Sequence, residues 1–250
     1  MKKAIVIGAS SGIGMEVAKL LLSDGWSLGV ASRRTELLEE LKHRAPDRVE
    51  LQAIDVNSED AGDLLLSLIA MTGGMDLFFY APGIGRQNPT LEPETEINTV
   101  TTNALGFTRM IGAAYRYMAN HGGGHIAAIT SIAGTKGLGP APSYSATKAF
   151  QSNYLQALEQ QANTRKLPIR FTDFRPGFVD TALLGDGRNY PMLMKKEDVA
   201  YEIVEALNKN VHVRVIDWRW RIVTAFWRRI PRWIWRRFRL FKIENQTKES

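Results

Sequence analysis

The chain has 250 residues, of which 44% are hydrophobic and 23% charged, and its formal net charge is +6 at pH 7. This length and composition fit one large or two small globular domains with a sizeable core, and they exclude a mostly disordered chain. The absence of cysteine excludes disulfides, thiolate metal sites and a cysteine nucleophile. No run reaches the roughly 18 consecutive apolar residues that a bilayer requires, so we expect no membrane-spanning helix.

Short apolar runs alternate with longer amphipathic runs along the first 215 residues, which is typical of βαβ units with helices on both faces of a parallel sheet. The sequence therefore predicts an α/β fold with a doubly wound, Rossmann-type parallel sheet of seven strands. The predicted strands are Lys3–Ile7, Ser27–Ala31, Val49–Ile54, Asp76–Tyr80, Gly124–Thr130, Ile169–Phe174 and Val211–Ile216. The predicted helices are Ile13–Ser23, Glu36–Arg44, Ser58–Met71, Glu96–Asn120, Tyr144–Asn163 and Lys196–Asn208.

A glycine-rich turn follows the first predicted strand and opens the first helix. Glycines there let a pyrophosphate approach backbone amides at a helix N-terminus, although any tight βα turn can use glycines. The spacing Gly-x-x-x-Gly-x-Gly differs from the Gly-x-Gly-x-x-Gly fingerprint, but the order of strand, turn and helix is the required one. We expect dinucleotide binding by Gly8, Ser10, Ser11, Gly12, Ile13 and Gly14.

Two arginines, Arg33 and Arg34, follow the second predicted strand. A cofactor with a free ribose 2′-hydroxyl usually meets an Asp or Glu there, whereas guanidinium groups suit a 2′-phosphate. The alternative is that both are solvated charges, but cations are poorly placed at the start of a helix. We therefore expect NADP(H) rather than NAD(H), with Arg33 as the first candidate.

Ser131, Tyr144 and Lys148 form the candidate catalytic group. Residues four apart share one face of a helix, so Tyr144 and Lys148 are neighbours. A phenol with a pKa near ~10 is a poor acid or base at neutral pH, and a nearby ammonium lowers that pKa by favouring phenolate. A Tyr-x-x-x-Lys pair also occurs by chance on amphipathic helices, so its neighbours in the sequence decide its meaning.

Taken together with the other motifs, these residues make the chain resemble the short-chain dehydrogenase/reductase family, in its single-domain branch, from Lys3 to about Asp217. Ile7 stands where the family usually has Thr before the glycine turn. The resemblance rests on Gly8, Gly12 and Gly14, on Asp55-Val56, on Asn103-Ala104-Leu105-Gly106, on Ser131, Tyr144 and Lys148, and on Pro176-Gly177-Phe178-Val179-Asp180-Thr181.

The resemblance implies a role for each residue. Tyr144 would give a proton to the alkoxide formed during reduction, and Ser131 would hydrogen-bond that oxygen. Lys148 would lower the pKa of Tyr144 and hold the nicotinamide ribose, and Asn103 would connect Lys148 to bulk water. The further cofactor contacts implied are Asp55 and Val56 at the adenine, and Pro176, Gly177, Val179 and Thr181 beside the nicotinamide.

One segment departs from the family pattern. Tyr80-Ala81-Pro82-Gly83 replaces the usual Asn-Asn-Ala-Gly, whose amides tie neighbouring strands together and line the adenosine side. Local sheet bonding and cofactor affinity are therefore open, while Ala81 and Gly83 stay candidate cofactor contacts. The alternative function is a non-catalytic dinucleotide-binding regulatory or scaffold protein.

Substrate selectivity is expected in the loops Ile84–Leu91, Thr135–Ser143 and Leu183–Met194. Their apolar residues suggest a lipophilic ketone, aldehyde or alcohol, although a lid also needs apolar residues to close on itself. The resemblance also implies a homodimer or homotetramer built on the helices Glu96–Asn120 and Tyr144–Asn163. The apolar loop residues are Leu138, Leu183, Leu184, Met192, Leu193 and Met194.

The positive charge is confined to the C-terminal segment. Residues 211–250 contain 11 Lys and Arg against three Asp and Glu, a charge of +8 that leaves −2 for residues 1–210, and they contain five of the six tryptophans. Apolar residues and arginines recur there at steps of three and four, and Pro231 interrupts them. We predict two short amphipathic helices joined near Arg229–Pro231, or one kinked helix, and divide the chain into a catalytic domain (1–217) and a basic aromatic segment (218–250).

Three kinds of surface are compatible with this segment. Tryptophan rings and guanidinium groups favour peripheral contact with anionic lipid through residues 218–241. The aromatic stripe could instead pack on the protein's own core or at a subunit interface. Nucleic acid is not expected, because no nucleic-acid-binding fold accompanies the charge.

His121 and His125 are separated by three glycines, so no metal is expected. We expect a cytoplasmic protein, with the inner face of a membrane as the candidate surface.

Overall fold

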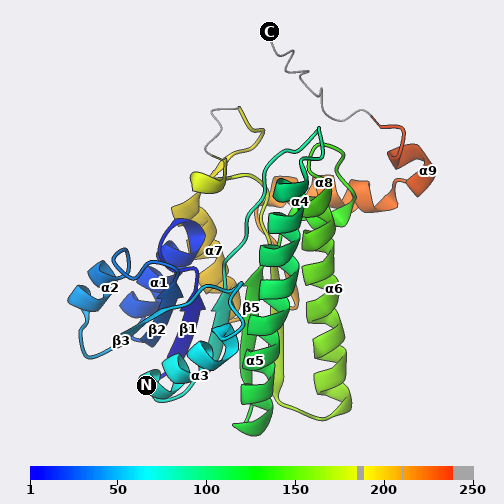
Figure 1. Cartoon of the computed structure of the whole chain (residues 1–250). Coiled ribbons are helices and arrows are strands. Elements are labelled where there is room, and N and C mark those ends of the chain that lie inside the picture. Colours follow the sequence, from blue (N-terminus) through cyan, green and yellow to red (C-terminus); the bar gives the residue numbers. More distant parts are fainter. Residues whose placement is uncertain (185–188, 210, 239–250) are drawn as a thin grey trace.

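The computed structural model describes residues 1–184, 189–209 and 211–238. Its parallel strands form one seven-stranded sheet in the order β3-β2-β1-β4-β5-β6-β9 (Figure 1). The chain crosses from one half of the sheet to the other between β3 and β4, so the switch point lies between β1 and β4. The predicted doubly wound sheet is confirmed. Its strands are β1 (Lys3–Ile7), β2 (Ser27–Ser32), β3 (Val49–Ala53), β4 (Leu77–Tyr80), β5 (Gly124–Ile129), β6 (Ile169–Arg175) and β9 (Val213–Val215).

Helices cover both faces of this sheet and form two separate hydrophobic clusters. Val17, Leu21 and Ile203 belong to one cluster, and Leu65 and Met110 belong to the other. On the first face lie α1 (Gly12–Ser23), α2 (Glu39–Arg44) and α7 (Lys196–Leu207), and on the second lie α3 (Ala61–Thr72), α5 (Phe107–Asn120) and α6 (Pro142–Thr164) (Figure 1).

The prediction of one continuous helix over Glu96–Asn120 is wrong, because a π-helical turn interrupts its middle. The segment consists of α4 (Pro93–Val100), a π-helical turn η1 (Thr101–Gly106) and α5. Inside η1, a Cβ at Gly106 would stand 2.9 Å from Val56 Cγ2. The Asn103 side chain, also in η1, accepts a hydrogen bond from the Ile84 amide in the loop after β4. Tertiary contacts therefore hold the wider turn, which periodicity alone could not indicate. Such turns are frequent at functional sites.

Smaller elements that the periodicity did not indicate line the edge of the sheet at which the strands end. They are the 3₁₀ turns η2 (Ile132–Thr135) and η3 (Ala182–Leu184), and a parallel pair of β7 (Val179–Asp180) with β8 (Met194–Lys195). Residues 185–188, which belong to the predicted selectivity segment Leu183–Met194, lie outside the described residues.

The C-terminal segment forms two helices, as predicted, and not one kinked helix. These are α8 (Trp218–Arg229) and α9 (Arg232–Trp235), and the residue before Pro231 is extended, as a following proline requires. The predicted boundary at 217/218 coincides with the start of α8, yet Trp220 is 3% exposed and belongs to the same core cluster as α1 and α7. Residues 239–250 of the predicted segment lie outside the described residues. Within the described chain, no helix is long and apolar enough to cross a membrane.

Candidate active site

The predicted site residues gather at one edge of the sheet, where the strands end. The glycine turn follows β1, Arg33 follows β2, Ala81 follows β4, Ser131 follows β5 and Pro176 follows β6. Because all seven strands are parallel, their carboxyl ends lie at this same edge, where open α/β sheets bind their ligands.

The glycine turn forms an open anion cradle. Gly8 and Gly12 have φ values of +81° and +57°, which side-chain-bearing residues rarely adopt. A Cβ at Gly14 would stand 2.3 Å from the Gly8 carbonyl oxygen, so the turn can close only with glycine there. Ser11 occupies the N-cap of α1 without a side-chain capping bond, and the first turn carries no acidic residue. The positive end of α1 is therefore open to a phosphate.

The segment that departs from the family pattern keeps the sheet paired. Tyr80 is in register with Ile7 on β1 and with Ala128 on β5, and the Ala81 amide donates to the Ile7 carbonyl oxygen at 3.0 Å. Local sheet bonding, which the sequence left open, is thus supplied by the backbone. The Pro82 ring lies on the glycine turn, 3.1 Å from where a Gly8 Cβ would be.

Tyr80 replaces an asparagine with an aromatic side chain that fills the core. The ring is fully buried and packs edge-on against Phe107, with 5.2 Å between the ring centroids. Burial raises the pKa of the Tyr80 phenol far above its ordinary value, and within the described chain its hydroxyl has no hydrogen-bond partner. This residue therefore contributes packing rather than a contact to the site.

Arg33 and Arg34 are exposed beside the glycine turn. Their strand is tied to the turn by a hydrogen bond of 2.8 Å from the Gly8 amide to the Ala31 carbonyl oxygen, and the Arg34 amide donates to Ser32 Oγ at 3.3 Å. Neither guanidinium forms an ion pair with a described residue. Both are thus available to an anion at this edge, which fits the expected phosphate.

Asp55 and Val56 lie in the turn after β3. Asp55 is exposed and its Oδ1 accepts from the Asn57 amide at 3.0 Å, while Val56 is buried against Gly106. The structure therefore brings this pair next to η1, the turn that carries Asn103.

Ser131, Tyr144 and Lys148 meet at the predicted place. Ser131 lies two residues after the end of β5, and its Oγ accepts from the Ala133 amide at 3.1 Å and is hydrogen-bonded to Tyr144. Tyr144 lies in the first turn of α6, and Lys148 Nζ is 5.8 Å from the centroid of its ring. The loop after β4 covers both residues, because a Cβ at Gly83 would stand 3.2 Å from Lys148 Nζ.

Burial dominates the pKa values of both residues. It raises the pKa of Tyr144, and the hydrogen bond with Ser131 opposes this only in part. It lowers the pKa of Lys148 to about 8, against the attraction of Asp173. The sequence analysis expected Lys148 to lower the pKa of Tyr144. In this structure the pKa is raised instead, because desolvation disfavours the phenolate more strongly than nearby groups stabilise it.

A buried glutamine connects Lys148 to Asn103. Lys148 Nζ donates to the Ile129 carbonyl oxygen at 3.2 Å and to Gln151 Oε1 at 3.0 Å, and Gln151 Nε2 donates to the Asn103 carbonyl oxygen at 2.8 Å. The sequence analysis missed Gln151, although its place three residues after Lys148 puts both on one helix face. A polar residue at that spacing was the available signal.

The side chain of Asn103 fixes the loop that covers Tyr144. Its Oδ1 accepts from the Ile84 amide at 2.9 Å, and its Nδ2 donates to the Ile84 carbonyl oxygen at 2.7 Å and to Thr147 Oγ1 at 3.2 Å. Next in this loop is Gly85, where a Cβ would stand 2.2 Å from Tyr144 Cδ2. Gly85 is thus a second residue that the sequence analysis missed.

The segment after β6 lies between Ser131 and the glycine turn. The Pro176 carbonyl oxygen accepts from the Ile132 amide at 3.1 Å, and Thr181 Cγ2 is 3.4 Å from where a Gly12 Cβ would be. On its other side a Cβ at Gly177 would stand 2.2 Å from Trp220 Nε1, so α8 packs directly on this segment.

The predicted selectivity loops differ in exposure. Leu183 and Leu193 are exposed, whereas Met194 is buried in the core as part of β8. Leu91 and Met192 have positive φ values of 57° and 52°, and such strained conformations cluster at functional sites.

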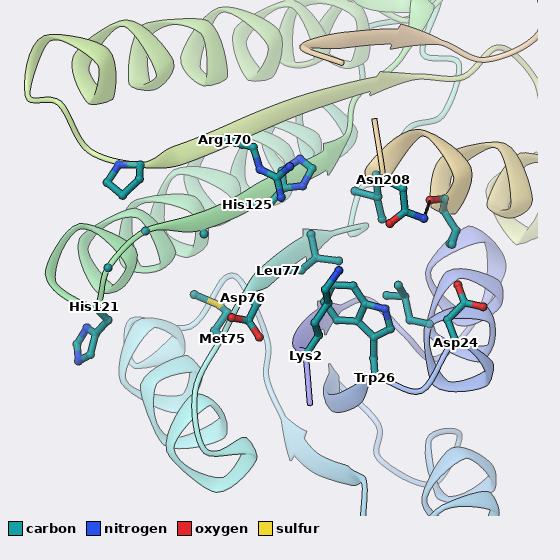
Figure 2. A pocket seen from close by; sticks show the side chains of 17 residues that line it. Lys2, Asp24, Trp26, Met75, Asp76, Leu77, His121, His125, Arg170 and Asn208 are labelled. Atoms are coloured by element: carbon teal, nitrogen blue, oxygen red, sulfur yellow. Dashed lines mark hydrogen bonds between the residues drawn. The ribbon is translucent and has the colours of Figure 1, made fainter. Parts of the chain in front are cut away.

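A cavity of about 490 Å³ lies at the opposite edge of the sheet, where the strands begin (Figure 2). Lys2, Trp26, Asp76, His125 and Arg170 are among its lining residues, and Figure 2 shows side chains of both charges around it. It contains none of the predicted site residues, so the candidate site is defined by the edge at which the strands end.

A doubly wound parallel sheet with a glycine turn beside its switch point and a Ser–Tyr–Lys group at the same edge defines a Rossmann-type oxidoreductase. A sequence model of the family described as short chain dehydrogenase matches residues 2–190. The chain therefore belongs to the short-chain dehydrogenase family of oxidoreductases.

Relatives of similar length support this membership. The chain is 32% identical over 216 residues to an uncharacterized oxidoreductase of Myxococcus xanthus, a match that covers 84% of this chain and 83% of that protein. It is 31% identical over 222 residues to an uncharacterized oxidoreductase of Staphylococcus saprophyticus, with 86% and 94% covered.

Solved structures share the fold. The alcohol dehydrogenase from Thermococcus sibiricus complexed with 5-hydroxy-NADP superposes with a TM-score of 0.78 at 23% identity, covering 86% of this chain and 96% of that chain. The 3-ketoacyl-(acyl-carrier-protein) reductase from Brucella melitensis complexed with NADH gives 0.75 at 22% identity, with the same coverage.

Proposed function

We propose that the protein is an NADP(H)-dependent reductase of a lipophilic ketone or aldehyde, or a dehydrogenase of the corresponding alcohol. The observation that carries this proposal is the meeting of Ser131, Tyr144 and Lys148 beside the open glycine turn. A nicotinamide dinucleotide would be held by the turn, and when bound it supplies or accepts the hydride.

The protein's own residues supply the proton and the alignment. The Tyr144 phenol is protonated at neutral pH and can donate to a substrate oxygen, although burial raises its pKa and makes it a weaker acid. Ser131, hydrogen-bonded to Tyr144, would hold that oxygen. In reduction the carbonyl carbon gains a hydride and the oxygen gains the Tyr144 proton, so the product is a neutral alcohol. The phenolate left on Tyr144 lies near the Lys148 ammonium, which stabilises it until a proton returns.

The choice of NADP(H) rests on two guanidinium groups that form no ion pair with a described residue. The related folds include complexes with an NADP derivative and with NADH, so the fold accepts either cofactor. Arg33 and Arg34 are exposed beside the turn, and a 2′-phosphate is the cofactor group that such side chains recognise.

The proposed assembly is a homodimer or homotetramer. Large apolar side chains are exposed on α4, η1 and α6, which include the helices that the family resemblance implies for assembly. These are Ile97 (64%), Val100 (44%), Leu105 (47%) and Phe150 (40%). A second copy of the chain would cover them. Analytical ultracentrifugation should show an oligomer that Ile97→Ser with Leu105→Ser dissociates, and a monomeric wild type would contradict the assembly.

The test of the activity is NADPH consumption with ketones and aldehydes graded by chain length. We expect turnover that rises with chain length, and loss of turnover by about 1,000-fold in Tyr144→Phe with NADPH binding retained. Tyr201→Phe, which alters an exposed tyrosine on α7, is the matched control and should behave as wild type. Equal turnover in Tyr144→Phe and wild type would refute the proton donor. Tight NADPH binding without turnover of any substrate would favour the regulatory alternative.

A further inference from the structure

The inner face of helix α8 packs against the protein's own core. Trp220 and Thr224 are buried, and Val223 and Trp227 pack against the same core cluster. The aromatic contacts continue outward from Phe178 to Trp220, with 5.6 Å between centroids, and from Trp220 to Trp227, with 6.3 Å. Core packing therefore explains Trp220 and Trp227 among the seven aromatic residues of positions 218–238.

The outer face of α8 carries a second apolar stripe that the protein leaves exposed. Trp218 is 64% exposed, Ile222 49% and Phe226 67%, and their spacing of four residues puts them on one side of the helix. Trp233 on α9 and Phe238 just after it are also exposed, at 63% and 55%. We call these five residues the outer stripe. Exposing apolar side chains of this size to water is unfavourable, and a partner that covers them would remove that free-energy cost.

The charge around the outer stripe has one sign. Residues 218–238 contain seven arginines and no aspartate or glutamate. Asp217, just before α8, pairs with Arg219, and no other ion pair to a described residue reaches this set. The exposed arginines are Arg219, Arg221, Arg228, Arg229, Arg232, Arg236 and Arg237.

We propose that the outer stripe and its arginines bind the surface of an anionic lipid bilayer. Large aromatic rings bordered by arginines suit the boundary between headgroups and acyl chains, where the rings are desolvated and the guanidinium groups meet phosphates. A second copy fits less well, because a two-fold contact through this face would set arginines against arginines.

The bilayer contact would lie beside the candidate active site. Lys136 Nζ donates to the Ile230 carbonyl oxygen at 2.9 Å, and Trp235 Nε1 donates to the Gly137 carbonyl oxygen at 2.7 Å. These two bonds tie α8 and α9 to the loop that follows Ser131, and α8 also contacts η2. In Figure 1 both helices, in orange and red, lie at the end of the molecule where α4 and α6 begin. A lipophilic carbonyl compound in the bilayer is the substrate source that this placement favours, a step that rests on the proposed function.

Vesicle flotation of the whole protein tests the proposal. We expect the wild type to float with vesicles of equal parts phosphatidylcholine and phosphatidylglycerol, and to stay at the bottom with phosphatidylcholine alone or in high salt. Trp218→Ser with Ile222→Ser and Phe226→Ser should lower the bound fraction by about tenfold or more. Leu66→Ser with Tyr201→Ser, which alters exposed apolar residues on α3 and α7, is the matched control and should float as the wild type does.

Three outcomes would overturn the proposal. The first is equal flotation of the triple variant and the wild type, and the second is indifference to lipid charge. The third is a wild type that ignores vesicles while the triple variant changes from oligomer to monomer in ultracentrifugation, which would make the face a subunit interface. Unchanged thermal unfolding of the triple variant shows that a loss of binding is not a loss of fold. Tyr144→Phe should float like the wild type, so lipid binding and the proposed activity fail separately.

Discussion

Lys148 and Gln151 share a buried hydrogen bond of 3.0 Å between Nζ and Oε1, one turn of α6 below Tyr144. The other end of the Gln151 amide donates to the Asn103 carbonyl oxygen at 2.8 Å. One fully buried side chain therefore fixes the position of the lysine and occupies the carbonyl that the π-helical turn presents. Gln151 acts through Lys148 and is a positioning residue.

Replacing Gln151 with leucine should lower kcat by roughly tenfold, because a buried ammonium left without this acceptor loses about 1–3 kcal/mol. The pKa of Lys148 should fall as well, since the charged form loses a hydrogen bond. Gln151→Glu should shift it upward by adding a negative charge. The measurement is the pH profile of kcat/KM. Gln156→Leu, on an exposed position of the same helix, is the control, and identical profiles in all four proteins would show that Gln151 is only a packing residue.

The buried Lys148 also makes the free energy of unfolding depend on pH. Its pKa is about 8 in the folded chain, against an ordinary value of 10.5. Between these values the unfolded chain binds a proton that the folded chain does not, so stability rises with pH across this window. The full rise is about 3 kcal/mol for one such group.

Urea denaturation at a series of pH values measures this rise. We expect Lys148→Met to flatten the curve between pH 8 and pH 10.5 relative to wild type. Lys209→Met removes an exposed lysine and should leave the curve unchanged. A wild-type curve that falls with rising pH across the window would contradict the burial of Lys148.

Arg33→Ala with Arg34→Ala should discriminate between the two cofactors. Loss of charge-assisted hydrogen bonds to a 2′-phosphate should raise the Kd for NADPH by about one to two orders of magnitude and that for NADH by less than about threefold. Fluorescence titration measures both constants. Arg44→Ala, which removes one exposed arginine paired with Glu40 on α2, is the control for loss of a surface arginine elsewhere. An equal loss for both cofactors would refute the 2′-phosphate assignment.

Gly85→Ala should damage turnover while leaving the glycine turn intact. The new Cβ would stand 2.2 Å from Tyr144 Cδ2, so the ring or the loop must move. A shift of about 1 Å at the proton donor lowers kcat by about 100-fold. Gly137→Ala is the matched control, because no described residue beyond its chain neighbours has an atom within 4 Å of its Cβ position. Steady-state kinetics with NADPH titration separates the two effects, and an unaltered kcat would mean that the loop yields to the methyl group.

Local patterns were sufficient for the sheet, the glycine turn and the Tyr144–Lys148 pair, whereas the role of Ser131 came from the family resemblance. Each depends on periodicity or on spacing along one element, which a sequence shows directly. The π-helical turn, the Gln151 bridge and the covering Gly85 depend on contacts between segments far apart in the chain. Asn103 is bonded to Ile84, 19 residues away, and Gln151 to Asn103, 48 residues away. The Lys148–Gln151 spacing is local, but nothing local in the sequence indicates that Gln151 bonds to Asn103 or Asn103 to Ile84.

Helix α8 carries both packed and exposed aromatic residues, so core packing and an exposed binding surface do not exclude each other. Trp220 packs inward and Trp218, two residues earlier, is exposed. A pattern of apolar steps of three and four cannot separate two apolar faces of one helix, because both contribute to the same periodicity.

The contact of Trp220 with Gly177 makes the two residues complementary in size, since any side chain at 177 would occupy the space of the indole. A chain that ends at residue 217 would lack the Trp220 indole that packs on Gly177. The segment that places Thr181 near the glycine turn would lose this support, so we expect the truncation to disturb the candidate active site as well. The face of α8 that packs on Gly177 and the face proposed to bind lipid belong to the same helix, so neither can be exchanged without changing the other.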